Sequence, residues 1–128
     1  AVARRAGRFE LAQGGTLCVV SSVAGDRGRK PVILYGAAKA GLLRYLEGLD
    51  HKFRSQGLKV VCVKPGFVKT GRTSGRRPPP FAVEPEGVAR DIVRAIDRGT
   101  PVVYTPPLAS PAALAFRLAA SPRGPPAA

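Results

Sequence analysis

Three side chains that could act on a carbonyl or an alcohol stand at a fixed spacing. Ser22 lies thirteen residues before Tyr35, and Lys39 follows Tyr35 by four residues. A tyrosine and a lysine at i and i+4 share one face of a helix. There an ammonium can lower the pKa of a phenol from its free value of about 10. A serine hydroxyl at the end of a strand can face the same point, so the spacing predicts acid/base chemistry.

The elements that must position these side chains follow from the apolar pattern. The near-continuous apolar run 16–22 predicts a strand buried on both faces, which is typical of a parallel sheet. Residues 35–55 have the spacing of a helix, and residues 58–63 form a second buried strand. We expect one helix face to be apolar through Ala38, Leu42, Leu46, Leu49 and Phe53. Two parallel strands joined by a helix make a right-handed βαβ unit.

The rest of the chain continues this pattern. Residues 1–11 resemble the end of a helix, and residues 70–80 form a basic loop rich in glycine and proline. Such loops beyond the carboxyl end of a strand often act as lids. A third helix is expected from Pro85 to Gly99, with Val88, Ile92 and Ile96 facing inward. A short last strand follows over residues 101–104.

Composition limits the possible functions. A chain of 128 residues with 45% hydrophobic residues can form one domain with a modest core. No apolar run reaches the roughly 18–20 residues that cross a membrane, so a cytoplasmic location is expected. Cys18 and Cys62 lie in apolar strands and are interpreted as free buried thiols, with a disulfide or a ligand pair as the alternative. His51 has no partner ligands in the sequence, so no metal site is expected.

The net charge of +13 raises the alternative of a nucleic-acid-binding module. The basic residues are scattered along the chain, and aromatic residues make up only 6% of it and are not interleaved with them. A surface on which bases could stack is therefore not expected. Steep salt-dependent affinity for DNA or RNA would favour this alternative.

One further segment connects these features with a known family. The second strand ends in Pro65-Gly66-Phe67-Val68-Lys69-Thr70. Together with the Ser22, Tyr35 and Lys39 spacing, it makes residues 1–105 resemble the short-chain dehydrogenase/reductase (SDR) family. The resemblance implies an NAD(P)-dependent oxidoreductase that transfers hydride between the nicotinamide of NAD or NADP and a small carbonyl or alcohol substrate.

The resemblance also implies a role for each matching residue. Tyr35 would donate or accept the proton of the substrate oxygen, and Ser22 would hydrogen-bond that oxygen. Lys39 would hold the nicotinamide ribose and lower the pKa of Tyr35. The cofactor would be lined by Pro65, Gly66, Val68 and Thr70. Family members also pair through the helix that carries this tyrosine, so a homo-oligomer is expected, with Gly41 and Gly48 allowing close approach.

The chain departs from the family in one large respect. No glycine fingerprint follows a strand, as a dinucleotide fold requires for the pyrophosphate, because Gly14-Gly15 precedes a strand. We therefore expect an α/β fold of three layers that is the C-terminal portion of a Rossmann-like doubly wound parallel sheet, with the N-terminal half missing. Residues 1–105 would be the catalytic part, with a lid over about 70–82 and an apolar, proline-rich tail over 106–128. The alternative is a truncated fragment that cannot catalyse the reaction.

Three segments are similar to one subgroup, the reductases of polyprenyl-phosphate-linked keto-sugars. These are the run Ser-Ser-Val-Ala-Gly-Asp-Arg-Gly-Arg that starts at Ser21, the segment Val103-Tyr104-Thr105-Pro106-Pro107, and the apolar tail. The similarity implies a lipid-linked substrate and a peripheral contact with the membrane surface. Packing of the tail against the domain is an equal alternative.

Overall fold

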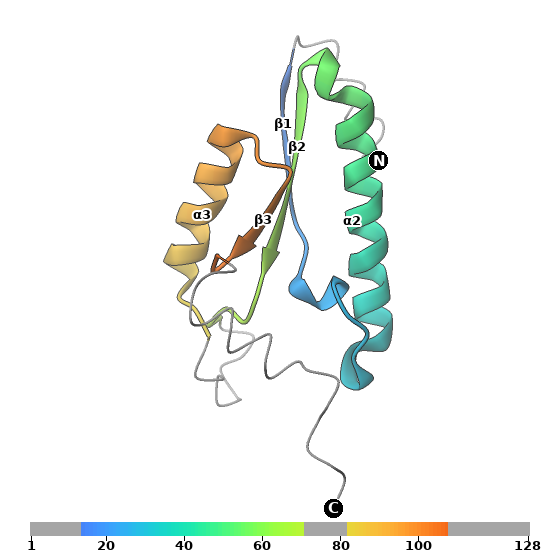
Figure 1. Ribbon diagram of the computed structural model, residues 1–128. Coiled ribbons are helices and arrows are strands. Elements are labelled where there is room, and N and C mark those ends of the chain that lie inside the picture. The colour runs from blue at the N-terminus through green and yellow to red at the C-terminus, as the bar shows by residue number, and fades with distance from the viewer. Residues whose placement is uncertain (1–13, 71–81, 108–128) are drawn as a thin grey trace, which may run out of the picture.

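The computed structural model describes residues 14–70 and 82–107, which form three layers. The strands are β1 (Gly15–Val20), β2 (Leu58–Pro65) and β3 (Val102–Thr105), and they make a parallel sheet in the order β1-β2-β3. Helix α2 (Ile33–Phe53) covers one face of the sheet and helix α3 (Pro85–Arg98) covers the other (Figure 1). The predicted parallel α/β architecture is confirmed. The expected helix end over 1–11, most of the expected lid and the tail from residue 108 on lie outside the described residues.

The apolar sequence of β2 puts this strand at the centre of the sheet. Its side chains alternate between two cores. Facing α2, Leu58, Val60 and Cys62 pack against Leu43, Leu46 and Leu49. On the α3 side, Val61 and Val63 pack against Ala95. A strand that must fill both layers reads as continuously apolar, which explains why the sequence predicted it well.

The predicted helix over 35–55 begins two residues early and has a different buried face at its start. A 3-10 turn, η2 (Lys30–Val32), leads into α2, and a second one, η3 (Arg54–Gln56), follows it and ends at Gly57 with φ 91°. Leu46 and Leu49 are buried as expected, and Leu43 is buried as well, whereas Ala38 is exposed. The prediction for Ala38 is wrong because the first turns of α2 pack against a loop and not against the sheet.

Helix α3 follows the prediction closely. Gly99 has φ 63° and caps the helix by donating its N–H to the carbonyl of Ala95 at 2.9 Å. Val88 is buried and Ile92 is partly buried against the sheet. A side-chain bond then ties the helix to β3, because the Thr105 hydroxyl donates to Asp91 Oδ2 at 2.7 Å.

The two cysteines are free thiols that lie on opposite faces of the sheet. Cys18 packs with the core on the α3 side, and Cys62 packs with the core on the α2 side. A disulfide between them is excluded by this geometry, because their side chains point away from each other. Cys18 is only partly buried, since β1 is the outer strand of the described sheet.

Candidate active site

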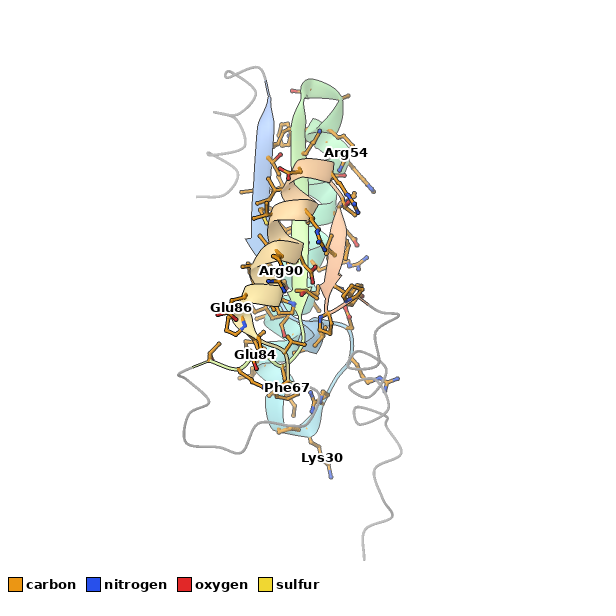
Figure 2. The ribbon with its side chains drawn as sticks, turned by 90° about the vertical axis from the view of Figure 1, so that its left-hand side faces the viewer. Lys30, Arg54, Phe67, Glu84, Glu86 and Arg90 are labelled. Atoms are coloured by element: carbon orange, nitrogen blue, oxygen red, sulfur yellow. The ribbon has the colours of Figure 1, made fainter. Side chains whose placement is uncertain are left out.

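The topology brings the predicted site segments to one end of the molecule. Ser22 lies two residues after the end of β1, Pro65 ends β2, and Tyr35 lies in the first turn of α2. The carboxyl ends of the strands and the amino ends of both helices meet at the lower end of Figure 1. In Figure 2 Lys30, Phe67 and Glu84 lie toward this end, and Arg54 lies at the opposite one. Ligands of open parallel sheets bind at the carboxyl ends of the strands.

Ser22 is held by a local backbone motif. The last ladder bond of β1 runs from the N–H of Ser21 to the carbonyl of Val63 at 2.7 Å, and Ser21 is buried. Ser22 then caps the 3-10 turn η1 (Val23–Gly25), and its Oγ accepts a hydrogen bond from the N–H of Ala24 at 3.1 Å. Because Oγ acts here as an acceptor, the hydroxyl keeps its own proton for donation to another group.

Two glycines let η1 rest directly on the first turns of α2. A Cβ on Gly36 would lie 2.9 Å from the carbonyl oxygen of Ala24, and a Cβ on Gly25 would lie 2.8 Å from the backbone of Lys39 and Ala40. These are backbone-to-backbone contacts that no larger residue permits. They fix the turn that begins at Ser22 against the helix segment that carries Tyr35 and Lys39.

The contact at Gly25 and Gly36 was not found by sequence reasoning, which named only Gly41 and Gly48, for the approach of a second copy of the chain. Apart from its own helix, a Cβ on either of these two glycines would meet no described atom within 4 Å. A usable signal was present, because Ala24-Gly25 follows the serine and Gly36 follows the tyrosine. Small residues on both sides of an expected contact indicate that two backbones meet.

Tyr35 and Lys39 share a face of α2 as their spacing predicts. The Lys39 ammonium lies 5.6 Å from the centre of the Tyr35 ring. Tyr35 is 50% exposed. The roles of Ser22, Tyr35 and Lys39 in a reaction stay predictions.

The segment Pro65–Thr70 is fixed at both its beginning and its end. Gly66 donates its N–H to the carbonyl of Thr105 at 3.0 Å. Val68 then pairs with Val83, so that the N–H of Lys69 donates to Val83 O and the N–H of Val83 donates to Phe67 O, both at 2.9 Å. The segment lies in a defined place next to β3, with Thr70 exposed at its end.

A buried lysine beside this segment was missed by sequence reasoning. The side chain of Lys64 is 3% exposed, and its ammonium pairs with Asp26, in the loop after η1. It also donates to the Tyr104 hydroxyl at 3.3 Å. Burial alone would lower the pKa of Lys64, but these two hydrogen bonds and the charge of Asp26 outweigh it and raise that pKa above its usual value. A lysine directly after the apolar run 60–63 of β2 was the signal.

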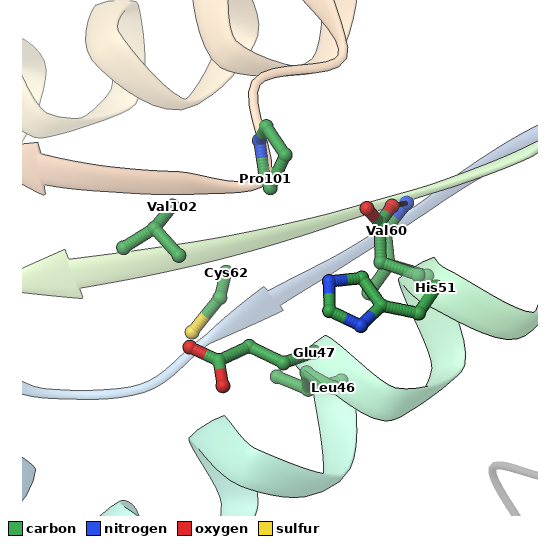
Figure 3. A pocket seen from close by; sticks show the side chains of 8 residues that line it. Leu46, Glu47, His51, Val60, Cys62, Pro101 and Val102 are labelled. Carbon is green, nitrogen blue, oxygen red and sulfur yellow. Dashed lines mark hydrogen bonds between the residues drawn. The ribbon is translucent and has the colours of Figure 1, made fainter. Parts of the chain in front are cut away.

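A shallow pocket on the α2 side of the sheet is separate from these residues. It is lined by Leu46, Glu47, Asp50, His51, Val60, Cys62, Pro101 and Val102 (Figure 3). None of the predicted site residues lines it. In residues 14–70 and 82–107, no three His, Cys, Asp or Glu side chains gather as a metal site requires. The helices of the same residues include none that is long and apolar enough to span a membrane.

Comparison with known proteins gives the family of the chain. The family model for short chain dehydrogenases matches residues 3–79. An uncharacterized oxidoreductase of Mycobacterium tuberculosis is 41% identical over 118 residues, which are 92% of this chain and 45% of that protein. One of Streptomyces coelicolor is 37% identical over 92 residues, or 72% of this chain and 36% of that protein. The chain belongs to the short-chain dehydrogenase family, and it spans about half the length, or less, of these curated relatives.

Solved structures show the same fold. A short-chain dehydrogenase from Sphingobium yanoikuyae in complex with NADPH is 26% identical, with a TM-score of 0.73 over 99% of this chain and 53% of that chain. An alcohol dehydrogenase from Comamonas testosteroni that is specific for bulky-bulky ketones is 24% identical, with a TM-score of 0.70 over 89% of this chain and 43% of that chain. The resemblance to the SDR family and the Rossmann-like fold are therefore confirmed.

Proposed function

We propose that this chain is the catalytic part of an oxidoreductase that uses NAD or NADP to interconvert a carbonyl and an alcohol. The observation that carries the proposal is the backbone contact between η1 and α2 at Gly25 and Gly36. This contact brings the segment of Ser22 against the helix turns of Tyr35 and Lys39. Membership of the short-chain dehydrogenase family supports the reaction class.

Each residue has a defined task in this proposal. The Tyr35 hydroxyl gives its proton to the substrate oxygen during reduction and takes it back during oxidation. The Ser22 hydroxyl donates a hydrogen bond to the same oxygen and so orients the substrate. The Lys39 ammonium lies 5.6 Å from the centre of the Tyr35 ring, on the same face of α2, so it is next to the reacting group. The bound cofactor supplies or accepts the hydride.

The residues of the second segment fit a nicotinamide cofactor. A Cβ on Gly66 would meet no described atom nearer than Pro106 Cδ at 3.9 Å, so space is open beside this backbone. Pro65, Gly66, Val68 and Thr70 would line the nicotinamide, and Lys39 would hold the ribose hydroxyls. The Sphingobium relative that was solved with NADPH supports a nicotinamide cofactor.

We propose that residues 1–105 are the C-terminal part of a larger catalytic domain, with a lid over about 70–82 and a tail over 106–128. The chain covers 45% of its Mycobacterium tuberculosis relative. In the described sheet β1 pairs only with β2, and the apolar side chain of Val20 is 50% exposed. An apolar strand with one open edge favours pairing with further strands. The alternative is that the 128 residues alone are a fragment without activity.

This alternative has a direct test. The purified 128-residue chain is mixed with NADPH, and cofactor fluorescence and ketone reduction are followed. Cofactor binding with turnover would eliminate the fragment hypothesis. Turnover only in a longer protein that contains the chain would support it.

The acid/base role of Tyr35 is tested with Tyr35→Phe in the longest active protein that contains this chain. General acid/base catalysis contributes about 10²- to 10⁴-fold, so turnover should fall by that factor while NADPH affinity stays unchanged. Tyr45→Phe is the matched control, because Tyr45 lies on the same helix and is 43% exposed, compared with 50% for Tyr35. Normal turnover in Tyr35→Phe would show that another group is the acid.

The expected partners extend the proposal. Gly41, Gly48 and the exposed Tyr45 leave part of α2 open for a second copy of the chain, in line with the predicted homo-oligomer. The lipid-linked substrate, the cytoplasmic location and the peripheral membrane contact stay predictions. Binding of nucleic acid, the rival proposal from the net charge, requires a steep loss of affinity with added salt.

A further inference from the structure

Lys64 stands at the junction between the two halves of the proposed site. It is the last residue of β2 before Pro65, and it pairs in register with Tyr104 of β3. Its side chain follows Leu58, Val60 and Cys62 onto the α2 face of the sheet. Helix α2, which carries Tyr35 and Lys39, covers this face of the sheet (Figure 1).

The partners of Lys64 come from two other elements. Asp26 follows η1 and lies four residues after Ser22, and Tyr104 belongs to β3. The ammonium also lies 5.1 Å from the centre of the Tyr104 ring. Lys64 thus connects the loop after Ser22 with the strand that continues into Pro65-Gly66 and with β3.

Burying the Lys64 ammonium in the sheet has a large desolvation cost. Removing such a charge from water is strongly unfavourable, and an apolar residue of similar volume is often neutral or better for stability. The neighbours of Lys64 on the same face of β2 are apolar. Packing alone therefore does not explain a lysine here, whereas a directional bond to the Ser22 loop does.

We propose that Lys64 is a positioning residue that clamps the Ser22 loop, through Asp26, to the end of β2. The clamp sets where the hydroxyl that binds the substrate oxygen stands relative to the segment Pro65–Thr70. This inference rests on the proposed function. A displacement of about 1 Å in such a site can reduce turnover by about 10²-fold.

The first test uses amide hydrogen exchange and needs no activity. Gly25 and Asp26 donate their N–H groups to Ser22 O and Val23 O at 3.2 and 3.1 Å, so they report on the order of η1. In the folded protein, Asp26→Asn and Lys64→Met should speed their exchange by about 10-fold or more, because local opening becomes easier. Amides in the middle of α2 should not change. Unaltered exchange at Gly25 and Asp26 in both variants would overturn the proposal.

The second test measures turnover with phenanthrenequinone and NADPH in the longest active protein that contains this chain. Active sites are counted by NADPH titration, so that loss of folded protein does not count as loss of catalysis. We expect kcat in Asp26→Asn and Lys64→Met to fall by about 10- to 100-fold, with NADPH affinity unchanged. Asp26→Glu keeps a carboxylate for the ammonium and should recover most of the loss.

A matched control separates this effect from the loss of any carboxylate. Glu47 pairs with Arg44 at 2.6 Å, and its side chain is 33% exposed, as is that of Asp26. Glu47→Gln should leave kcat unchanged. Normal kcat in both Asp26→Asn and Lys64→Met, while Tyr35→Phe is inactive, would refute the positioning role alone. If Tyr35→Phe also keeps full activity, Tyr35 is not the acid of the proposed function, and the two failures are told apart in this way.

Discussion

Asp50 is the residue whose replacement should destabilise the fold most clearly. Its carboxylate is buried near the end of α2 and accepts the N–H of Val60 at 3.1 Å and the Nε of Arg54 at 2.8 Å. The N–H groups of Val60 and Cys62 both point toward the side of β2 where β3 lies. The Cys62 N–H donates to Pro101 O, just before β3, but β3 does not extend as far as Val60, so the Val60 N–H needs the Asp50 carboxylate as its acceptor. Arg54 in turn donates to Gly99 O at 3.1 Å, so the group joins α2, β2 and the turn before β3.

The expected loss of stability follows from these contacts. Asp50→Ala leaves the Val60 N–H buried without an acceptor, which costs about 1–3 kcal/mol. The bond to Arg54 adds no more than about 1 kcal/mol, because that side chain is 40% exposed. We expect the free energy of unfolding to fall by about 1–4 kcal/mol in Asp50→Ala. Asp50→Asn keeps an acceptor for Val60 and should lose only about 1 kcal/mol.

The charge of Asp50 adds a dependence on pH. Burial alone would raise the pKa of Asp50, but the hydrogen bonds from Arg54 and Val60 and the charge of Arg54 outweigh it and lower that pKa below 3.8. A carboxyl whose pKa is lowered by folding stabilises the protein above its unfolded pKa, and this contribution is lost as the pH falls through the folded pKa. The stability of Asp50→Asn should therefore depend less on pH below about 4 than that of the wild type.

The assay is urea unfolding of the longest stable protein that contains this chain, followed by circular dichroism at neutral pH and at several acidic pH values. Equal losses in Asp50→Ala and Asp50→Asn would mean that charge, and not the acceptor for Val60, is what matters. If Asp50→Ala is as stable as the wild type, the buried Val60 N–H does not depend on Asp50 as its acceptor, and the reasoning is wrong.

Two further predictions concern the glycine contact and the thiols. Gly36→Ala places a Cβ 2.9 Å from Ala24 O and should lower kcat by about 10-fold or more by displacing η1. Gly87→Ala is the control, because its Cβ would meet nothing closer than 3.9 Å and kcat should not change. Equal kcat in both variants, measured per NADPH-binding site, would contradict the contact argument. Burial raises the pKa of Cys18 and of Cys62, so both should react more slowly with Ellman's reagent in the native protein than after unfolding. Cys62, which is 1% exposed, should be the slower of the two, and its rapid reaction in the native protein would contradict its burial.

The fold could be predicted from the sequence where burial was complete. Strand β2 is apolar because it serves two cores, and its start at Leu58 was predicted correctly. Strand β1 was predicted over 16–22, but the ladder to β2 pairs Gly15 to Val20 only. Ser22 turns away to cap η1, where its Oγ accepts the Ala24 N–H and its carbonyl accepts the Gly25 N–H. Apolar patterns do not contain such local bonds.

The candidate site could be predicted only in part, for a related reason. Spacing along a helix is a local property, so Tyr35 and Lys39 were found to share a face from sequence alone. The distance between Ser22 and that face depends on a contact between two distant backbones, at Gly25 and Gly36. Glycine is required there because a Cβ would collide with the backbone of the facing segment, and that segment can be identified only in the folded chain.

Lys64 shows the same limit from the opposite direction. In sequence it is one of the two lysines of β2, with Lys59, and the usual interpretation is a solvent-exposed side chain. Its burial follows from the order of the strands, which covers β2 on both sides and leaves Asp26 and Tyr104 as partners for the charge. An ionised group in such a position is tolerated only with its partners in place. The Asp26–Lys64 ion pair therefore binds the loop after Ser22 to the sheet, and its interaction weakens if either element moves. This makes the pair a sensitive reporter of the geometry of the site.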